Sequence, residues 1–299
     1  MGVDISRYRF FQDIHLWPTM SELNYEGWLE NFDEGEEREL AAQILGFFVY
    51  FPENMVNQLF KTVIGRVGTF FKALDSSWTD NSFKNDCWYS YIPGEVPHES
   101  DSGGLFARKV REVLDVDEQQ RFMSCDKLIE MLKSAKTPQK VILTDDFVGS
   151  GCQCDNAWNS NELYDDIDVS LKDVVAAGHH NVVYAPLIMN YVGANRILNY
   201  CTGLQLECIH LLGVEYDLFS SCCGCWAGKE DRYKAGTEML IRKSKELGIP
   251  ESGDISIRGF HNQGLALAFS HGIPDACPAL FFWESDNWRP LKKKHLTRM

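Results

Sequence analysis

The sequence lacks a long apolar run and an excess of positive charge. No apolar stretch approaches the ~20 residues that a membrane-spanning helix needs, so we expect no association with a membrane. Lys and Arg number 29 against 43 Asp and Glu, which gives a net charge of −14. Because contacts to phosphates dominate nonspecific binding of nucleic acids, this balance argues against a nonspecific nucleic-acid surface.

A secretory signal and a complete set of zinc-binding cysteine pairs are also absent. Ten cysteines without such a signal predict reduced thiols and a cytoplasmic location. The segment 222–225 reads CCGC, and Cys152, Cys154 or His210 could supply a fourth ligand. Structural zinc sites normally have two C-x(2–4)-C pairs, and no clean second pair occurs here. We therefore expect no zinc, and thiols packed as small apolar groups.

Length and composition are those of a globular protein with an ample core. Apolar residues make up 44% and charged residues 24% of the 299 positions. Amphipathic periodicity predicts helices over residues 21–32, 36–51 and 52–74. We expect residues 1–78 to form an N-terminal helical extension that packs on an α/β domain, residues 79–299.

Beyond residue 78, apolar strands alternate with helical segments. Such alternation predicts a parallel α/β sheet. The predicted strands are 87–92, 141–143, 181–189, 205–214 and 264–270, and the predicted helices are 105–110, 125–133, 170–177, 193–200 and 229–245.

The stretch 140–153, KVILTDDFVGSGCQ, organises the predicted site. Its apolar residues predict a buried parallel strand with Asp145 and Asp146 at the carboxyl end, followed by the small-residue turn 149–151 and a helix. Ligands of open parallel sheets bind at such strand ends, and amides of a glycine turn with the positive end of a helix suit a phosphate. Carboxylates beside them suit sugar hydroxyls or Mg²⁺. The alternative is an ordinary strand with an Asp-capped turn.

This order of residues resembles the ribose-phosphate motif of type I phosphoribosyltransferases. The resemblance implies that Asp145 and Asp146 hold the ribose hydroxyls of phosphoribosyl pyrophosphate and contribute to catalysis, together with Mg²⁺. It also implies that the loop wraps the 5-phosphate. The substrate-binding residues implied in this stretch are Phe147, Val148, Gly149, Ser150, Gly151, Cys152 and Gln153.

Two departures from that motif bear on activity. Loops of the family usually carry threonines where this chain has Gly149 and Gln153, so Ser150 is the loop hydroxyl that remains for the phosphate. Purine-salvage members place an acid before the Ser/Thr-Gly pair, and here that position is Gly149. Chemistry on hypoxanthine or guanine is therefore disfavoured.

A second candidate anion loop precedes a basic helix. Ser102, Gly103 and Gly104 lead into this helix, and Arg108 follows one turn later. Type I phosphoribosyltransferases hold pyrophosphate in a Gly-containing loop upstream of the acidic motif. The resemblance therefore implies that these four residues bind the pyrophosphate. A capped helix start explains the same residues equally well.

A loop near the carboxyl terminus is a candidate site for the base. His271 and Asp275 lie in a rigid Pro/Gly loop, and with Trp283 and Trp288 they could frame a planar ring. Packing and turn formation explain most of these residues as well. The tail 290–299, PLKKKHLTRM, is basic, and we expect it to be mobile.

Four separate segments resemble the phosphoribosyltransferase-like family of bacterial conflict and anti-phage systems. They are the helical start with Trp28 and Phe32, the Ser-Gly-Gly at 102–104, the motif 145–153, and the closing segment 271–283. The resemblance implies an effector or accessory protein that acts beside an ATPase or a reverse transcriptase. Three functions stay open: an enzyme acting at ribose C1 of phosphoribosyl pyrophosphate or a nucleotide, a catalytically silent nucleotide sensor, and an interaction subunit.

Overall fold

The computed structural model describes residues 4–94, 101–160 and 168–294, with the backbone alone for 101–103. Internal contacts divide the chain into two compact units. We call residues 56–211 the sheet unit, and residues 1–55 with 212–299 the terminal unit. This division differs from the predicted boundary at residue 78, which stays a prediction.

The sheet unit is built on a parallel β-sheet, which confirms the predicted fold class. Its strands follow the order β2 (Cys87–Tyr91), β3 (Lys140–Val148), β4 (Asn181–Asn190) and β5 (Gln205–Leu206), and β6 (His210–Leu212) also pairs with β4. Strand β4 is buried along nearly its whole length. Its sequence, NVVYAPLIMN, is almost wholly apolar, as expected for a central strand that is covered on both faces.

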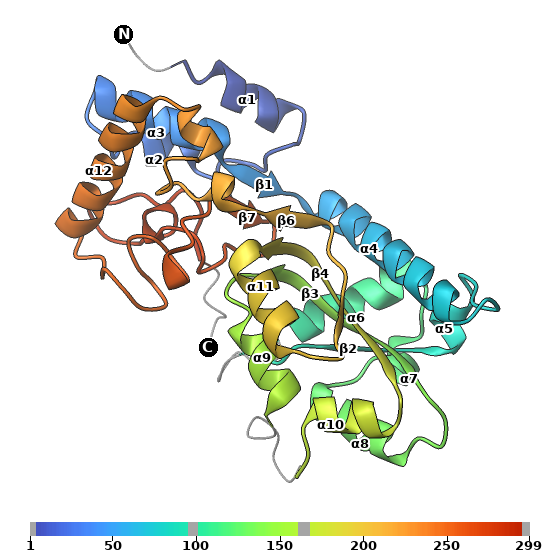
Figure 1. The fold of residues 1–299 in the computed structure, drawn as a ribbon. Coiled ribbons are helices and arrows are strands. Elements are labelled where there is room, and N and C mark those ends of the chain that lie inside the picture. The colour runs from blue at the N-terminus through green and yellow to red at the C-terminus, as the bar shows by residue number, and fades with distance from the viewer. Residues whose placement is uncertain (1–3, 95–100, 161–167, 295–299) are drawn as a thin grey trace. The chain divides into compact units, whose positions relative to one another are not determined.

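Helices cover the two faces of this sheet. They are α4 (Glu53–Leu74), α5 (Ser82–Asn85), α6 (Asp101–Leu114), α7 (Glu118–Arg121), α8 (Cys125–Ser134), α9 (Cys152–Asn159), α10 (Leu171–Ala177) and α11 (Tyr191–Tyr200). Helices α8, α9 and α10 bury apolar side chains in one cluster with Leu143 of β3 and Tyr184 of β4. Helix α6 contacts β2 and β3 and lies behind the sheet in Figure 1, with α9 and α11 in front.

The prediction of one continuous strand over residues 205–214 is wrong, because this segment forms two short strands, β5 and β6. Glu207 N donates to Tyr184 O at 2.9 Å, and Ile209 N donates to Leu187 O at 3.1 Å. Pro186 lies between these two acceptors on β4. Because proline has no N–H group, β4 cannot offer an uninterrupted ladder at this point.

The terminal unit has a two-stranded sheet and an aromatic core. Its elements are α1 (Ser6–Asp13), α2 (Tyr25–Leu29), α3 (Glu36–Phe47), β1 (Val49–Phe51), η1 (Val214–Tyr216), η2 (Gly224–Trp226), α12 (Glu230–Glu246), η3 (Phe260–Asn262), β7 (Leu267–Phe269) and η4 (Ala279–Phe281). Trp28 is fully buried against Phe32 and Phe281. Its indole N–H donates to Leu280 O at 3.0 Å, so the buried donor is satisfied.

Strand β1 corrects the predicted helix 36–51, which ends at Phe47. Val49 to Phe51 pair in parallel with β7 instead. Valine, tyrosine and phenylalanine favour strands, and the residue before Pro52 avoids the helical region. The predicted strand 264–270 is accordingly shorter and belongs to this small sheet.

The expected mobility of the basic tail is also wrong for residues 290–294. Leu291 and Lys292 are 0% and 2% exposed, and Asn24 N donates to Leu291 O at 2.7 Å. The apolar Leu291 anchors this segment within the terminal unit. The rest of the predicted tail, 295–299, lies outside the described residues.

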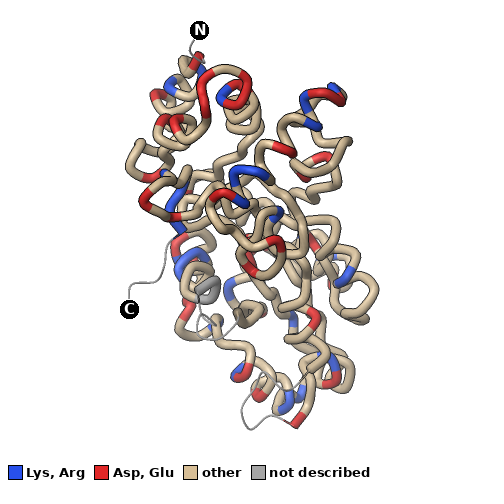
Figure 2. Tube along the Cα trace, turned by 90° about the vertical axis from the view of Figure 1, so that its left-hand side faces the viewer, with Lys and Arg blue, Asp and Glu red and all other residues tan. Residues whose placement is uncertain are grey.

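Opposite charges are interspersed along both units, as Figure 2 shows. In the terminal unit, Arg232 and Lys243 of α12 pair with Glu39 and Glu37 of α3 at 3.8 and 3.4 Å. Across the described ranges, every helix falls short of the length and apolarity that a membrane crossing requires.

Candidate functional site

The two predicted acids lie on β3, which continues past them to Val148. Asp145 pairs in register with Pro186 of β4. The two neighbouring carboxyl groups interact with each other, and they differ in their exposure. Asp145 is 7% exposed, whereas Asp146 is half-buried. The strand therefore extends further than predicted, and the two acids are not equivalent.

Asp145 is held inside the sheet unit by two hydrogen bonds. The Tyr184 hydroxyl donates to Oδ2 at 2.7 Å, and Asp146 N donates to Oδ1 at 2.9 Å. Burial raises the pKa of Asp145 well above its usual range, and the negative charge of Asp146 adds to this effect. Asp146 accepts from Phe147 N at 3.0 Å and is the more accessible acid.

The turn after β3 leads directly into α9, as predicted. Gly151 caps this helix with a φ of 75°, a conformation that glycine adopts without steric cost. Ser150 Oγ accepts from Cys152 N at 3.3 Å, which leaves the hydroxyl hydrogen able to donate. Cys152 and Gln153 lie in the first turn of α9 rather than in the loop. The role of these residues in binding phosphate stays a prediction.

Helix α11 packs closely on this turn through Gly193. The side chain of Asn190 accepts from Val192 N at 3.0 Å and caps the start of α11. A Cβ atom at Gly193 would lie 2.5 Å from Gly149 O and 2.8 Å from Val148 Cγ1. Only glycine allows this approach. Sequence patterns do not single out Gly193, although a glycine near the start of a predicted helix is a signal of close packing.

A second feature that the sequence does not single out is a cation beside the turn. Arg196 follows Gly193 on α11, and its side chain pairs with Asp155 of α9 at 3.1 Å. The Arg196 Cβ would lie 3.4 Å from a Cβ atom at Gly151. The predicted cation, Arg108, pairs instead with Glu112 of its own helix at 2.9 Å, with 62% of its side chain exposed.

The predicted second anion loop has a different conformation from the one expected. Helix α6 begins at Asp101, so Ser102, Gly103 and Gly104 lie in its first turn. The side chain of Ser102, and all of Ser100, fall outside the described residues. Binding of pyrophosphate by this segment stays a prediction. The contacts would come from the start of a helix rather than from a loop.

The candidate residues for the base lie in the terminal unit. His271 stacks on Phe269 with ring centroids 5.1 Å apart, and Asp275 pairs with Lys294. Trp288 is 4% exposed and packs edge-on against Phe32 at 5.4 Å, so it belongs to the core and does not frame a ring. Ligand binding by His271 stays a prediction.

The cysteine segment holds free thiols. Cys223 and Cys225 are buried and Cys222 is exposed. Burial raises the pKa of Cys223 to about 11, which disfavours the thiolate that binds metals. Within the described ranges, no group of three or more His, Cys, Asp or Glu side chains is arranged to hold a metal ion.

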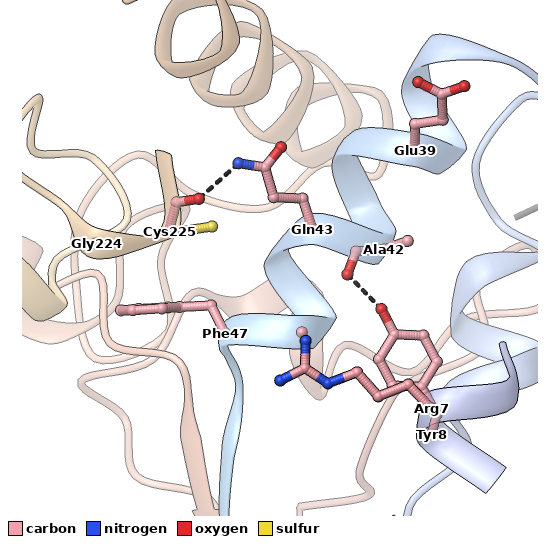
Figure 3. Close-up of a pocket in the computed structure, with 9 residues that line it drawn as sticks. Arg7, Tyr8, Glu39, Ala42, Gln43, Phe47, Gly224 and Cys225 are labelled. Carbon is pink, nitrogen blue, oxygen red and sulfur yellow. Dashed lines mark hydrogen bonds between the residues drawn. The ribbon is translucent and has the colours of Figure 1, made fainter. Parts of the chain in front are cut away.

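A cavity of about 430 Å³ opens between α1, α3 and the turn at Gly224 in the terminal unit (Figure 3). Two of its polar side chains are engaged within the protein. Tyr8 Oη donates to Ala42 O at 2.6 Å, and Gln43 donates to Cys225 O. These hydrogen bonds join the lining elements to one another, and they give the cavity a structural role.

The PRTase-CE family model matches residues 25–294. The match includes β3, the turn, α9 and α11, and it extends into the terminal unit at both ends. No curated protein matches the chain.

Proposed function

This chain belongs to the PRTase-CE family, a family of phosphoribosyltransferase type, and we propose that it binds a ribose carrying a 5-phosphate, as phosphoribosyl pyrophosphate or a nucleotide. The observation that carries this proposal is the strand–turn–helix of the sheet unit. Asp146 lies near the carboxyl end of an apolar parallel strand, and the glycine turn that follows the strand enters α9 through a positive φ at Gly151.

Each part of this site suits one part of the ligand. The Ser150 hydroxyl and the first turn of α9 suit the 5-phosphate, because amides and a helix start stabilise an anion. Arg196 adds a positive charge beside the same turn. Asp146 suits the ribose hydroxyls, whereas Asp145 is a positioning residue, since its Oδ2 already accepts from Tyr184.

Magnesium fits this donor set as a partner of the substrate. Mg²⁺ commonly binds through one or two carboxylates together with substrate phosphates, and it keeps several waters. Asp146 is a half-buried carboxylate near the carboxyl end of β3, so a magnesium–pyrophosphate complex is a better fit than an ion held by protein alone. When bound, the ion offsets charge on a departing pyrophosphate.

We further propose that the protein acts at ribose C1, with loss of pyrophosphate or a base, in bacterial anti-phage defence. To test this, we would incubate the full chain and D146N with Mg²⁺ and phosphoribosyl pyrophosphate, or with a mixture of nucleotides. Pyrophosphate or free base should appear with the wild type and fall at least tenfold with D146N. Equal release by both proteins would refute the assignment.

A silent nucleotide sensor is the second candidate, and the burial of Asp145 favours it. One of the paired acids, Asp145, already accepts a hydrogen bond from Tyr184. Gly149 occupies the position at which purine-salvage enzymes have an acid that acts on the base. A sensor would bind phosphoribosyl pyrophosphate in calorimetry without turnover. Co-purification with the products of neighbouring genes, such as an ATPase or a reverse transcriptase, tests the accessory role.

A further inference from the structure

A second cavity of the terminal unit, of about 480 Å³, lies at the carboxyl ends of two parallel strands. Strands β1 and β7 lie side by side (Figure 1). Pro52 and Glu53, which follow β1, line the cavity together with Ser270, which follows β7. Ligands of parallel sheets bind at this end of the strands, so the cavity has the position of a ligand site.

The walls of this cavity are largely apolar. Trp17, Pro18 and Tyr50 line it beside Pro52. Trp17 stacks on Tyr8 with ring centroids 5.5 Å apart and is 3% exposed, so packing fixes this wall. A cavity of this size with aromatic walls accommodates a ring-sized organic group.

Two carboxylates line the same cavity, and no lysine or arginine does. Glu22 and Glu53 are exposed, and neither side chain takes part in an ion pair or a hydrogen bond within the described ranges. The positive end of α4 begins at Glu53 and would attract an anion, but the Glu53 carboxylate lies at that same helix start and offsets it. The lining therefore favours a positive charge.

A buried lysine lies outside the lining, behind Ser270 and Tyr50. Lys292 is 2% exposed, and its Nζ lies 3.4 Å from Ser270 O and 5.8 Å from the centroid of the Tyr50 ring. Burial lowers the pKa of Lys292, and the negative charge of Glu22 opposes that shift. One lysine whose charge is disfavoured by burial does not balance two carboxylates, so the cavity keeps a negative charge.

Tyr50 offers the cavity a polar group that the protein leaves unused. The residue is 4% exposed, and its hydroxyl has no hydrogen-bond partner among the described residues. The fully buried side-chain groups that lack a partner there are those of Trp78, Ser90 and Gln263, so the Tyr50 hydroxyl keeps accessible surface. Burial and the negative charge of Glu22 raise the pKa of Tyr50 to about 12, which keeps the hydroxyl neutral. Its oxygen can accept a hydrogen bond from a ligand.

We propose that this cavity is a second ligand site, which takes a small organic cation with one ammonium group and an apolar body of up to ring size. The ammonium group faces Glu22 and Glu53 and donates to the Tyr50 hydroxyl, and the apolar body lies against Trp17. The aromatic walls add an attraction between the cation and their ring faces. The site is independent of the phosphoribosyl site on β3, which takes an anion, and neither assignment rests on the other.

The first test compares three probes that share one ring and differ in charge. Benzylamine is a cation, benzyl alcohol is neutral and benzoate is an anion. His15 also lines the cavity, and a buffer at about pH 8 keeps imidazoles neutral while benzylamine stays protonated. In calorimetry with the full chain, we expect benzylamine to bind at millimolar concentration, benzyl alcohol about threefold more weakly, and benzoate more weakly than either. The proposal is overturned if benzoate binds as tightly as benzylamine, or if benzylamine does not bind below about 10 mM.

Charge-removing variants locate the binding in this cavity. E22Q and E53Q keep the side-chain length, and we expect each to weaken benzylamine about threefold and the double variant about tenfold. E36Q is the matched control, because Glu36 is the first residue of α3 as Glu53 is of α4, and it is likewise exposed and without an ion pair in the described part of the chain. E36Q should bind as wild type does. A double variant that binds as tightly as wild type would overturn the proposal.

The variant Y50F tests the hydroxyl and keeps the ring. Because the protein leaves this hydroxyl unused, Y50F should melt at the same temperature as wild type and bind benzylamine about threefold more weakly. Undiminished binding by Y50F would refute the proposed contact. A free amine and a lysine side chain of another protein present the same ammonium group, so Nα-acetyl-lysine methylamide is titrated beside benzylamine, and the tighter ligand identifies the source.

Discussion

The hydroxyl of Tyr184 on β4 donates a 2.7 Å hydrogen bond to Oδ2 of Asp145 on the neighbouring strand β3. Both residues are buried, and they join the two central strands of the sheet unit just before the glycine turn. We expect this bond to decide how the paired acids divide their roles. Asp145 is buried within the unit, and in the proposed site Asp146, the more accessible acid, faces the ligand.

Replacement of Asp145 by Asn should change how stability depends on pH. The folded pKa of Asp145 lies well above its usual value near 3.8, so the folded chain keeps a proton that the unfolded chain releases. Wild-type stability should therefore fall relative to D145N as the pH rises through the unfolded pKa toward the folded pKa, and the difference should level off only well below the unfolded pKa. Urea unfolding at pH 3.5, 5, 6 and 7.5 measures it.

The control for this experiment is Y184F, which removes the donor and keeps the carboxyl. Loss of one buried hydrogen bond should lower the stability of Y184F by about 1–3 kcal/mol. Because Asp145 still titrates in Y184F, the pH dependence should persist. A difference between wild type and D145N that does not vary from pH 3.5 to 7.5 would show that Asp145 is not protonated preferentially in the folded chain.

Asp146 should matter more than Asp145 for magnesium-dependent binding. We expect D146N to bind phosphoribosyl pyrophosphate at least tenfold more weakly in calorimetry, about 1.4 kcal/mol, because it loses the accessible carboxylate. D145N should lose less, since Asp145 acts by positioning. Removal of Mg²⁺ with EDTA should weaken wild type more than D146N. If D145N lost more affinity than D146N at equal stability, the roles of the two acids would be exchanged.

The contact between α11 and the glycine turn predicts an effect at Gly193. In G193A the new Cβ would lie 2.5 Å from Gly149 O, a backbone atom, so the helix or the turn must shift. Strain of this kind lowers stability by about 1–3 kcal/mol, and the displaced turn should bind phosphate more weakly. Chemical denaturation and calorimetry measure the two effects.

Gly65 of α4 is the matched control for this substitution. Nothing lies within 4 Å of a Cβ at Gly65, and alanine is the better helix former, so G65A should be neutral or up to about 1 kcal/mol more stable. If G193A were as stable as G65A and bound ligand normally, α11 would not support the turn.

The sequence was sufficient to predict the parallel core and the order of strand, turn and helix at the site. Strands β3 and β4 are continuous apolar runs, and Gly151 marks the turn between β3 and α9. β1 was not predictable in the same way, because its apolar residues continue the pattern of α3, and periodicity alone does not separate a short strand from a helix end.

Contacts between distant segments were beyond sequence reasoning. Tyr184 lies 39 residues from Asp145, and no local pattern relates them. Ser102 to Gly104 were predicted as a loop because of their glycines, yet helix α6 already begins at Asp101. Gly and Ser are tolerated in the first turn of a helix, so composition does not settle where α6 starts.

The last prediction concerns Arg196, which we expect to contribute to phosphate binding where Arg108 does not. Arg196 lies beside Gly151, where it pairs with Asp155 and lies over the ring of Tyr200, whereas Arg108 pairs on the surface of α6. R196Q should weaken binding of ribose 5-phosphate about tenfold, because a charge-assisted contact to the phosphate is lost, and R108Q should bind like wild type. D155N releases Arg196 from its ion pair and should bind at least as tightly as wild type. Calorimetry on the four proteins measures these affinities. If R196Q bound as tightly as wild type, Arg196 would not belong to the site. If R196Q and R108Q both bound more weakly by the same factor, overall charge, and not position, would govern binding.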